Sequence, residues 1–259
     1  MPAEGHFIDQ YSRSIIALHI FGGPFFMPDW GLYVITDRHI AQSRPLSAIV
    51  EAAIAGGASA VQLREKVATT REMIELGHAL HSITKAANIP LIVNDRVDVA
   101  LAIDAEGVHV GQKDMPARLA RQLLGPTKIL GVSVTTPTEA HQAEVEGADY
   151  IGAGDIFGTL SKVDAGVPIG IHTLTAIVQA VSIPTVGIGG ITAQNAIQVI
   201  RAGASGIAVI SAVMGAANIE QTARQLRTII CSSGFAGGKL TIPHWNSKNE
   251  LSWLYGSQT

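Results

Sequence analysis

Eight short runs of apolar, largely β-branched residues recur along the chain, and they restrict its fold more than any other feature. Each run is continuously apolar rather than alternating, which is typical of strands buried on both faces of a sheet. The segments between the runs carry the periodicity of amphipathic helices. The predicted strands are 32–36, 60–63, 91–94, 107–110, 129–133, 150–152, 185–188 and 207–210.

Several of the intervening helices have recognisable ends. Segment 46–54 carries its apolar residues on one face and stops at Gly56. Thr136 and Glu139 have the spacing of a capping box around a proline at the first helical position. Thr192 is predicted to cap a further helix.

Alternation of eight strands with helices in about 200 residues predicts a single (β/α)₈ TIM barrel. We place the barrel at residues 31–230. A doubly wound open sheet is the alternative, but it leaves exposed edges and the chain lacks a dinucleotide fingerprint. Residues 1–30 and 231–259 carry no such repeat, and we interpret them as an N-terminal extension and a C-terminal tail outside the barrel.

Composition narrows the function classes. The chain has 259 residues, of which 47% are hydrophobic and 15% charged, which argues against disorder. The net charge of −3 makes nucleic acid an unlikely partner class, so an anionic ligand needs a local basic cluster. The single Cys231 excludes a disulfide framework and a cysteine-based zinc site.

The beginning of the chain does not predict a membrane anchor. Segment 15–27 is apolar but too short to span a bilayer, and Glu4 and Asp9 precede Arg13 where a secretory signal carries a basic leader. We therefore expect a soluble, cytoplasmic protein with no membrane partner. A transit segment and a homo-oligomeric assembly stay open alternatives.

The active site of such a barrel lies at the carboxyl ends of its strands. After the second strand, Gln62, Arg64 and Lys66 share one face because side chains alternate along an extended segment. Two cations and an amide aimed together favour a polyanion such as a diphosphate. The alternative is a solvated strand end in which Glu65 pairs with Arg64 or Lys66.

Two carboxylates follow the third and fourth strands. Asp95 and Asp114 stand above neighbouring strands, so they can reach a common point. Hard oxygen ligands beside a polyanion are what Mg²⁺ prefers. In the alternative, Asp95 only pairs with Arg96 and Asp114 only caps the helix after Pro116.

The later strands end in polar or glycine-rich segments. Ser133 ends the fifth strand, and loop 152–162 after the sixth combines glycines with Thr159, Ser161 and Lys162, which favours an anion cradle. The alternatives are a serine that bonds back to the chain and an ordinary flexible loop.

The seventh and eighth strands end in glycines and in a short segment that opens a helix. Segments 187–192 and 209–211 have the character of the monophosphate site of phosphate-binding barrels. A purely packing role for these glycines is the alternative.

In combination, these blocks resemble the thiamine-phosphate synthase family over roughly residues 32–230. The blocks that carry the resemblance are VQLREK at 61–66, VNDRVDVA at 93–100, GVHVGQ at 107–112 with Asp114, GVSV at 131–134 and GIGGI at 187–191. The resemblance implies a transferase that joins two phosphorylated small molecules, hydroxymethylpyrimidine diphosphate and hydroxyethylthiazole phosphate, and releases pyrophosphate.

The resemblance also implies roles for individual residues. The pyrimidine diphosphate would be bound by Gln62, Leu63, Arg64, Glu65, Lys66, Asn94, Ser133 and Lys162, of which Arg64, Lys66, Ser133 and Lys162 would act in catalysis. Asp95 and Asp114 would hold the Mg²⁺ cofactor. The thiazole phosphate would be bound by Thr159, Ser161, Gly190, Ile210 and Ser211. The reaction would be dissociative and need no protein nucleophile, which fits a sequence without an evident Ser–His–Asp arrangement.

The chain departs from the family pattern mainly in the loop after the sixth strand. Asp155 and Gly158 stand where the family usually has proline, Ser161 stands for a threonine, and Thr135 stands where relatives often carry histidine. Gly158 predicts a looser loop, and Asp155 places a carboxylate near the expected phosphates. Two rival functions are a related thiazole tautomerase, which would not need the metal pair, and an inactive ligand-binding barrel.

Overall fold

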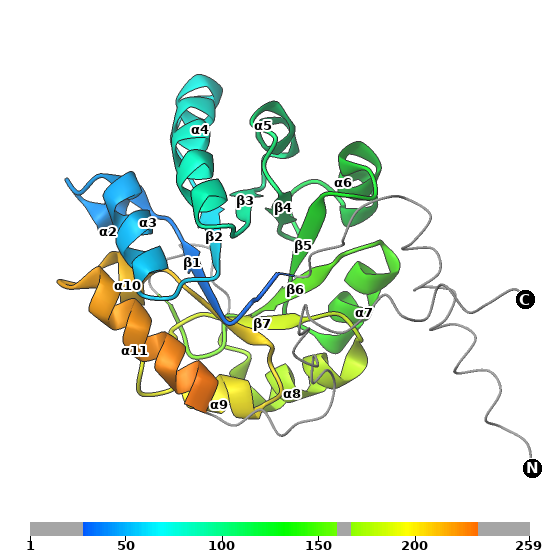
Figure 1. Ribbon diagram of the computed structural model, residues 1–259. Coiled ribbons are helices and arrows are strands. Elements are labelled where there is room, and N and C mark those ends of the chain that lie inside the picture. Colours follow the sequence, from blue (N-terminus) through cyan, green and yellow to red (C-terminus); the bar gives the residue numbers. More distant parts are fainter. Residues whose placement is uncertain (1–27, 160–166, 233–259) are drawn as a thin grey trace, which may run out of the picture.

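The computed structural model describes residues 28–159 and 167–232, in which eight parallel strands close into one barrel (Figure 1). The strands are β1 (Leu32–Ile35), β2 (Ala60–Leu63), β3 (Leu91–Asn94), β4 (Gly107–Val110), β5 (Ile129–Val134), β6 (Tyr150–Ala153), β7 (Thr185–Ile188) and β8 (Gly206–Val209). Each strand lies within one residue of its predicted bounds. β8 pairs with β1, with Leu32 opposite Ile207, so the predicted barrel is confirmed and the open-sheet alternative is wrong.

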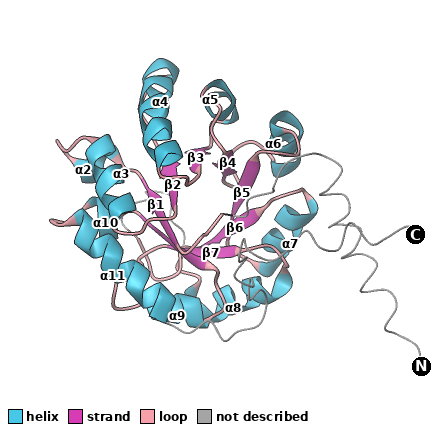
Figure 2. Ribbon diagram, in the orientation of Figure 1, coloured by secondary structure: helices cyan, strands magenta, loops and turns pink. Residues whose placement is uncertain are grey.

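The helices form a layer around the outside of the strands (Figures 1 and 2). They are α2 (Arg38–Ala41), α3 (Leu46–Ala55), α4 (Thr70–Ala86), α5 (Val97–Ala102), α6 (Ala117–Leu124), α7 (Pro137–Val145), α8 (Gly170–Ala180), α9 (Ala196–Arg201), α10 (Ser211–Met214) and α11 (Ile219–Ser232). Among the described residues, none of the helices combines the length and hydrophobicity that crossing a membrane requires.

The predicted helix starts are partly confirmed. Thr136 caps α7, because its hydroxyl accepts a hydrogen bond from the Glu139 amide. The Glu139 carboxylate, however, accepts from the amide of Thr135 rather than from that of Thr136, so the reciprocal half of the predicted capping box is wrong. Thr192 does not cap α9, because a turn intervenes and the helix begins after Asn195.

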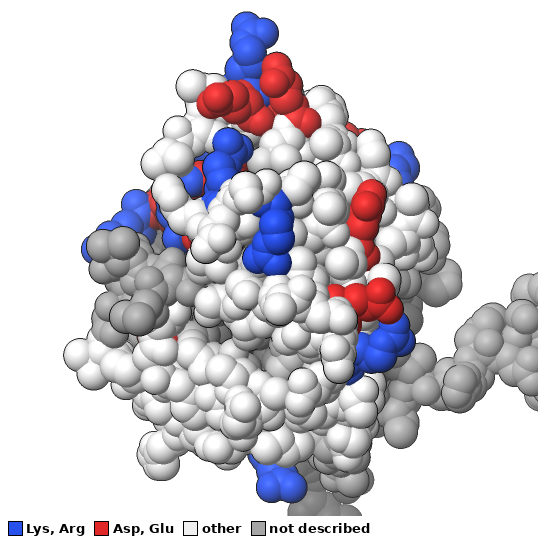
Figure 3. Space-filling view, turned by 90° about the vertical axis from the view of Figure 1, so that its left-hand side faces the viewer, with Lys and Arg blue, Asp and Glu red and all other residues white. Residues whose placement is uncertain are grey.

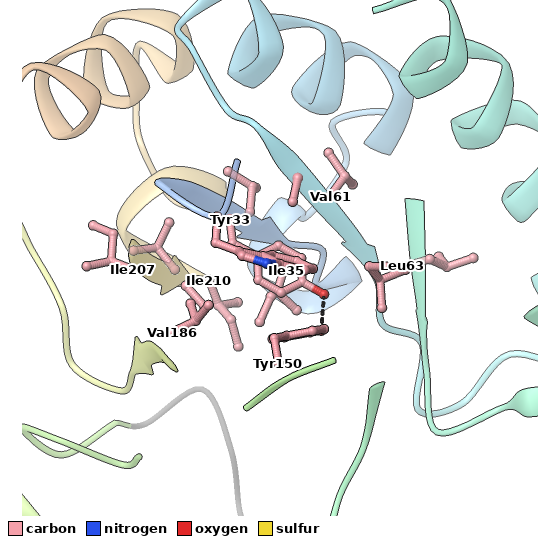
Figure 4. Packing of buried hydrophobic residues seen from close by; sticks show 14 of the residues in the cluster. Tyr33, Ile35, Val61, Leu63, Tyr150, Val186, Ile207 and Ile210 are labelled. Carbon is pink, nitrogen blue, oxygen red and sulfur yellow. Dashed lines mark hydrogen bonds between the residues drawn. The ribbon is translucent and has the colours of Figure 1, made fainter. Parts of the chain in front are cut away.

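Aromatic residues pack inside the hydrophobic cluster shown in Figure 4. Tyr33 and Tyr150 are fully buried, and the Trp30 ring stacks on Tyr150 with 4.0 Å between ring centroids. The sequence boundary at residue 30 leaves Trp30 in the N-terminal extension, yet the structure places it in the core. A lone tryptophan has no periodicity from which this packing could be predicted.

Charges on the surface are mixed. On the face shown in Figure 3, Lys and Arg side chains lie among Asp and Glu side chains, and uncharged residues cover most of the surface. This distribution agrees with the small net charge of the chain. Any strong site for an anion among the described residues must therefore arise from local geometry.

Candidate functional site

The end of β2 places alternate side chains on opposite sides of the barrel wall. Gln62 lies inside the barrel, where its Nε2 donates to the Tyr33 hydroxyl at 2.8 Å. Leu63 is fully buried on the other side, near Gly77 of α4. Any contact of Leu63 with a ligand at the mouth would therefore come from its backbone.

The two cations after β2 are already paired with carboxylates. Arg64 is almost fully buried, and its Nη1 lies 2.7 Å from Oδ2 of Asp37. Lys66 is half exposed, and its Nζ lies 2.8 Å from Oδ2 of Asp95. The predicted triad is therefore not a cluster of free cations, because each charge has a partner from another loop.

Glu65 pairs with neither of its sequence neighbours. Its side chain is 2% exposed, and its carboxylate lies 3.2 Å from Nε of Arg38 in α2. The alternative interpretation of the second strand end, in which Glu65 neutralises Arg64 or Lys66, is wrong. Sequence reasoning missed Asp37 and Arg38, because Asp37 caps α2 and Arg38 begins it, and both approach the end of β2 only in the folded barrel.

Asp95 and Asp114 meet above β3 and β4, as their placement on neighbouring strands predicts. The Asp95 carboxyl group is close enough to Asp114 to affect its ionisation, and Lys66 Nζ lies 2.8 Å from Asp95 Oδ2. Asn94, a predicted ligand of the pyrimidine diphosphate, ends β3 opposite His109 of β4. The described residues contain no group of three or more His, Cys, Asp or Glu side chains placed to hold a metal ion.

Burial and the neighbouring Asp95 raise the pKa of Asp114 above its ordinary value. Burial is the larger cause, and the amide of Gly111, which donates to Asp114 Oδ2 at 2.9 Å, acts in the opposite direction. Two carboxyl groups in contact repel when both are ionised. The pair is therefore a place where a cation would relieve an unfavourable charge.

The alternative interpretations of the two carboxylates are wrong. Arg96 pairs with Asp98 at 2.6 Å, and Asp95 pairs with Lys66 instead. The residue that flanks the start of α6 is Pro116, and no side chain caps this helix. Asp114 instead bonds within its own loop.

Ser133 belongs to a line of hydrogen bonds through the barrel, which we call the interior chain: Gln62, Tyr33, Tyr150, His109 and Ser133. The Tyr33 and Tyr150 hydroxyls lie 3.0 Å apart, as drawn in Figure 4. The Tyr150 hydroxyl lies 2.9 Å from His109 Nδ1, and His109 Nε2 lies 2.9 Å from Ser133 Oγ.

The sequence shows no evident Ser–His–Asp arrangement, yet the structure brings Ser133 and His109 together. The partner on the second ring nitrogen of His109 is the Tyr150 hydroxyl, which cannot supply the negative charge that the carboxylate of such a triad provides. Sequence reasoning missed Tyr33, His109 and Tyr150 as parts of the site. They lie within strands, where polar residues facing the barrel interior look like ordinary strand positions.

The loops after β6 and β7 are joined by backbone hydrogen bonds. The Phe157 amide donates to the Gly189 carbonyl at 3.1 Å. Gly190 has φ +63°, and a Cβ at this position would overlap the carbonyl oxygen of Gly158. A glycine is therefore required at Gly190 both by conformation and by the close approach of the two loops.

The remaining predicted residues of the thiazole phosphate site lie around these loops. Ile210 is buried just before α10, Ser211 is exposed at its first position, and Thr159 is partly exposed at the end of the β6 loop. Ser161 and Lys162 lie outside the described residues. The described part of this half therefore supplies backbone groups and hydroxyls.

The Asp155 carboxylate is directed into its own loop. Its Oδ1 accepts from the Gly158 amide at 3.0 Å and lies directly against Gly189. Its Oδ2 is buried and has no hydrogen-bond partner among the described residues. Gly158 has φ +91°, so this turn uses the conformational freedom that glycine brings.

Comparison with known proteins agrees with this barrel and its loops. The family described as "Thiamine monophosphate synthase" matches residues 32–213. The chain belongs to the thiamine monophosphate synthase family. It is 56% identical over 204 residues to the thiamine-phosphate synthase of Moorella thermoacetica, covering 79% of this chain and 97% of that protein. It is 57% identical over 202 residues to that of Chloroflexus aurantiacus, with 78% and 93% covered.

The three-dimensional structure is also similar to that of a solved protein with a thiamine phosphate pyrophosphorylase fold. The solved thiamine phosphate pyrophosphorylase from Pyrococcus furiosus is 45% identical, with a TM-score of 0.73, and the match covers 80% of this chain and 98% of that one. The chain is therefore an enzyme of the transferase class. The departures at Asp155 and Gly158 are local changes within a retained fold.

Proposed function

We propose that this chain is a Mg²⁺-dependent thiamine-phosphate synthase. It condenses 4-amino-2-methyl-5-hydroxymethylpyrimidine diphosphate with 4-methyl-5-(2-hydroxyethyl)thiazole phosphate and releases pyrophosphate. The observation that carries the proposal is the proximity of Asp95 and Asp114, with Lys66 paired to Asp95, at the mouth of a barrel of this family. The enzyme would act in the cytoplasm on two small phosphorylated substrates, without nucleic acid or membrane.

The two carboxylates fit a magnesium ion. The raised pKa of Asp114 reflects a negative charge that burial and Asp95 disfavour, and a divalent cation would remove this penalty. Asp95 and Asp114 would hold the ion, with other ligands from water and the diphosphate. When bound, Mg²⁺ supplies charge neutralisation for a diphosphate leaving group.

Other residues of the chain would bind and orient the pyrimidine diphosphate. Arg64 and Lys66 follow β2, beside the strand ends that carry the two carboxylates, and would bind the diphosphate. Lys162 would add a further cation. Gln62 and Ser133 would orient the pyrimidine. The C–O bond to the diphosphate would break first, and the thiazole nitrogen would then attack the pyrimidine-methyl cation, so that no protein nucleophile is needed. Positioning of the two substrates would supply much of the rate.

The second substrate would bind at the opposite side of the mouth. The Gly190 backbone, Ile210, Ser211, Thr159 and Ser161 would hold the thiazole phosphate through amides and hydroxyls. The inward direction of the Asp155 carboxylate supports this assignment, because its Oδ1 is engaged by the Gly158 amide. The change from the family's proline at this position is therefore compatible with an anion nearby.

A coupling assay tests the proposal. Purified enzyme receives both substrates with and without Mg²⁺, and thiamine phosphate and pyrophosphate are quantified. We expect both products in equal amounts and only with the metal. The matched variants Asp114→Asn and Asp98→Asn separate the site from its surroundings, because Asp98 is exposed and pairs with Arg96. The first should abolish product formation, and the second should leave it unchanged.

Three other outcomes would contradict the proposal. Equal product without divalent metal would remove the role of the carboxylate pair. Isomerisation of a thiazole substrate without coupling would favour the tautomerase. Binding of the diphosphate without turnover would favour a ligand-binding barrel.

A further inference from the structure

The interior chain lies where water cannot easily complete its hydrogen bonds. Tyr33, Tyr150 and Gln62 are each at most 2% exposed, and His109 is 8% exposed. Burial raises the pKa of Tyr33 and of Tyr150 well above the ordinary tyrosine range, so both hydroxyls keep their hydrogens. A buried donor without an acceptor is costly, so each of these hydrogens needs a partner within the chain.

This requirement gives the interior chain a direction. Gln62 donates to the Tyr33 oxygen, and the only other partner of the Tyr33 hydroxyl among the described residues is the Tyr150 hydroxyl. Tyr33 therefore donates to Tyr150. The Tyr150 hydrogen in turn points to His109 Nδ1. A neutral imidazole that accepts at Nδ1 carries its hydrogen on Nε2, which donates to Ser133 Oγ.

The opposite direction leaves a hydrogen without a partner. If His109 donated from Nδ1, Tyr150 would donate to Tyr33, whose oxygen would then accept twice. The Tyr33 hydrogen would have no acceptor among the described residues, inside a fully buried site. A doubly protonated His109 would also leave the Tyr33 hydrogen without an acceptor, because both ring nitrogens of His109 would donate.

We propose that Tyr150 and His109 are positioning residues that hold Ser133 as a hydrogen-bond donor towards the substrate. Because His109 occupies a lone pair of Ser133 Oγ, the hydroxyl hydrogen of Ser133 is available to an acceptor at the barrel mouth. A pyrimidine ring nitrogen is an acceptor of this kind. The inference rests on the proposed function for the identity of that acceptor, but not for the direction of the chain.

The packing around Tyr150 supports a fixed arrangement. Trp30 stacks on its ring, and Gly131 of β5 leaves the space that the ring fills, because a Cβ there would overlap the phenol. The Tyr150 ring is therefore held from two sides. A rigid hydroxyl is what a positioning role requires.

Nuclear magnetic resonance of the ¹⁵N-histidine-labelled full chain tests the direction without any substrate. Of the nine histidines in the sequence, His109 is identified by the signals lost in His109→Gln. We expect the neutral tautomer with hydrogen on Nε2, and a partial change to the Nδ1–H form in Tyr150→Phe. His141→Gln, on the exposed face of α7, is the matched control and should leave the His109 signals in place.

Binding measurements by calorimetry test the consequence for the substrate. Tyr150→Phe should weaken binding of the pyrimidine diphosphate about fivefold to tenfold, the effect of roughly one hydrogen bond. Binding of inorganic pyrophosphate with Mg²⁺ should change less than twofold, because the diphosphate is held elsewhere. His109→Gln, which can still direct an N–H towards Ser133, should bind the pyrimidine diphosphate more tightly than His109→Asn.

Three results would overturn the inference. The first is a wild-type His109 with hydrogen on Nδ1 or on both nitrogens. The second is equal weakening of pyrophosphate and pyrimidine diphosphate in Tyr150→Phe, which would indicate general damage to the fold. The third is no weakening at all. A wild-type enzyme that makes no thiamine phosphate would instead contradict the proposed function, and the tautomer would still decide the direction of the chain.

Discussion

At the ends of β2, β3 and β4 the mouth of the barrel is lined by charged side chains, whereas at the ends of β6, β7 and β8 the described residues present mainly backbone groups. The charged half contains the Arg64–Asp37 and Lys66–Asp95 pairs and Asp114. The backbone half consists of two loops that touch at Gly190. Under the proposed function, one half would bind its anion through charged side chains and the other through backbone groups. Substitutions in the two halves should therefore have different effects on stability and on substrate binding.

The largest effect should come from the carboxylates of the charged half. Asp95→Ala should lower kcat about a hundredfold or more, because the proposed Mg²⁺, which would neutralise the leaving group, would lose a ligand. The double variant with Asp114→Ala should lose about as much as either single variant, since residues that act as a unit are not additive. Rates of thiamine phosphate formation at saturating Mg²⁺ measure this. Losses that multiply would argue against one shared ion.

The next effect concerns the buried ion pair. Asp37→Ala leaves Arg64 as a buried cation without this partner, and it should lower the free energy of unfolding by about 3–5 kcal/mol. Asp98→Ala removes the partner of the more exposed Arg96 and should cost at most about 1 kcal/mol. Urea unfolding of both variants makes the comparison. Equal decreases in the free energy of unfolding would show that the stabilising effect of the Arg64–Asp37 pair does not depend on its burial.

A glycine variant tests the backbone half. Gly190→Ala should lower the free energy of unfolding by roughly 1–3 kcal/mol, because a positive φ and an overlap with Gly158 act together. It should raise KM for the thiazole phosphate and leave KM for the pyrimidine diphosphate unchanged. Gly125→Ala is the control, because Gly125 has φ +69° and open space around its Cβ position. Equal effects of both variants on KM would contradict the assignment of this half.

The smallest effect is a pH dependence of stability. The pKa of Asp114 is raised in the folded protein above its ordinary value of 3.8, so folding favours the protonated form. Its contribution to stability is full below pH 3.8 and is lost as the pH rises through the folded-state pKa.

Asp114→Asn should therefore stabilise the metal-free protein at neutral pH, by at most about 1 kcal/mol after solvent screening, and not at about pH 3. Excess Mg²⁺ should reverse the order of stability, because under the proposed function it would bind the folded wild-type protein and stabilise it. Thermal unfolding at the two pH values, with and without Mg²⁺, checks this. If the variant is less stable than the wild-type protein at neutral pH without metal, the inferred repulsion between Asp95 and Asp114 is wrong.

The sequence was sufficient to predict the barrel and the strand on which, or after which, each candidate residue among the described ones stands. Continuous apolar runs and helical periodicity are local patterns, and eight alternating units can close in only a few ways. The meeting of Asp95 and Asp114 was predictable for the same reason, because neighbouring parallel strands end at the same edge. Alternation along β2 likewise separates Gln62 from Leu63 without any knowledge of the neighbouring strands.

Only the tertiary structure decided the partners of these residues. Arg64 pairs with Asp37, Glu65 with Arg38, and Ser133 with His109, across sequence separations of 24 to 27 residues. The strands concerned are neighbours that the sequence predicts, but a hydrogen bond depends on distances of a few tenths of an ångström, and only the packing of side chains in the closed barrel sets these distances. Sequence alone therefore determined the fold and the strand ends at which the described candidate residues stand. Packing decided which further residues join them and how charges and hydrogens are paired.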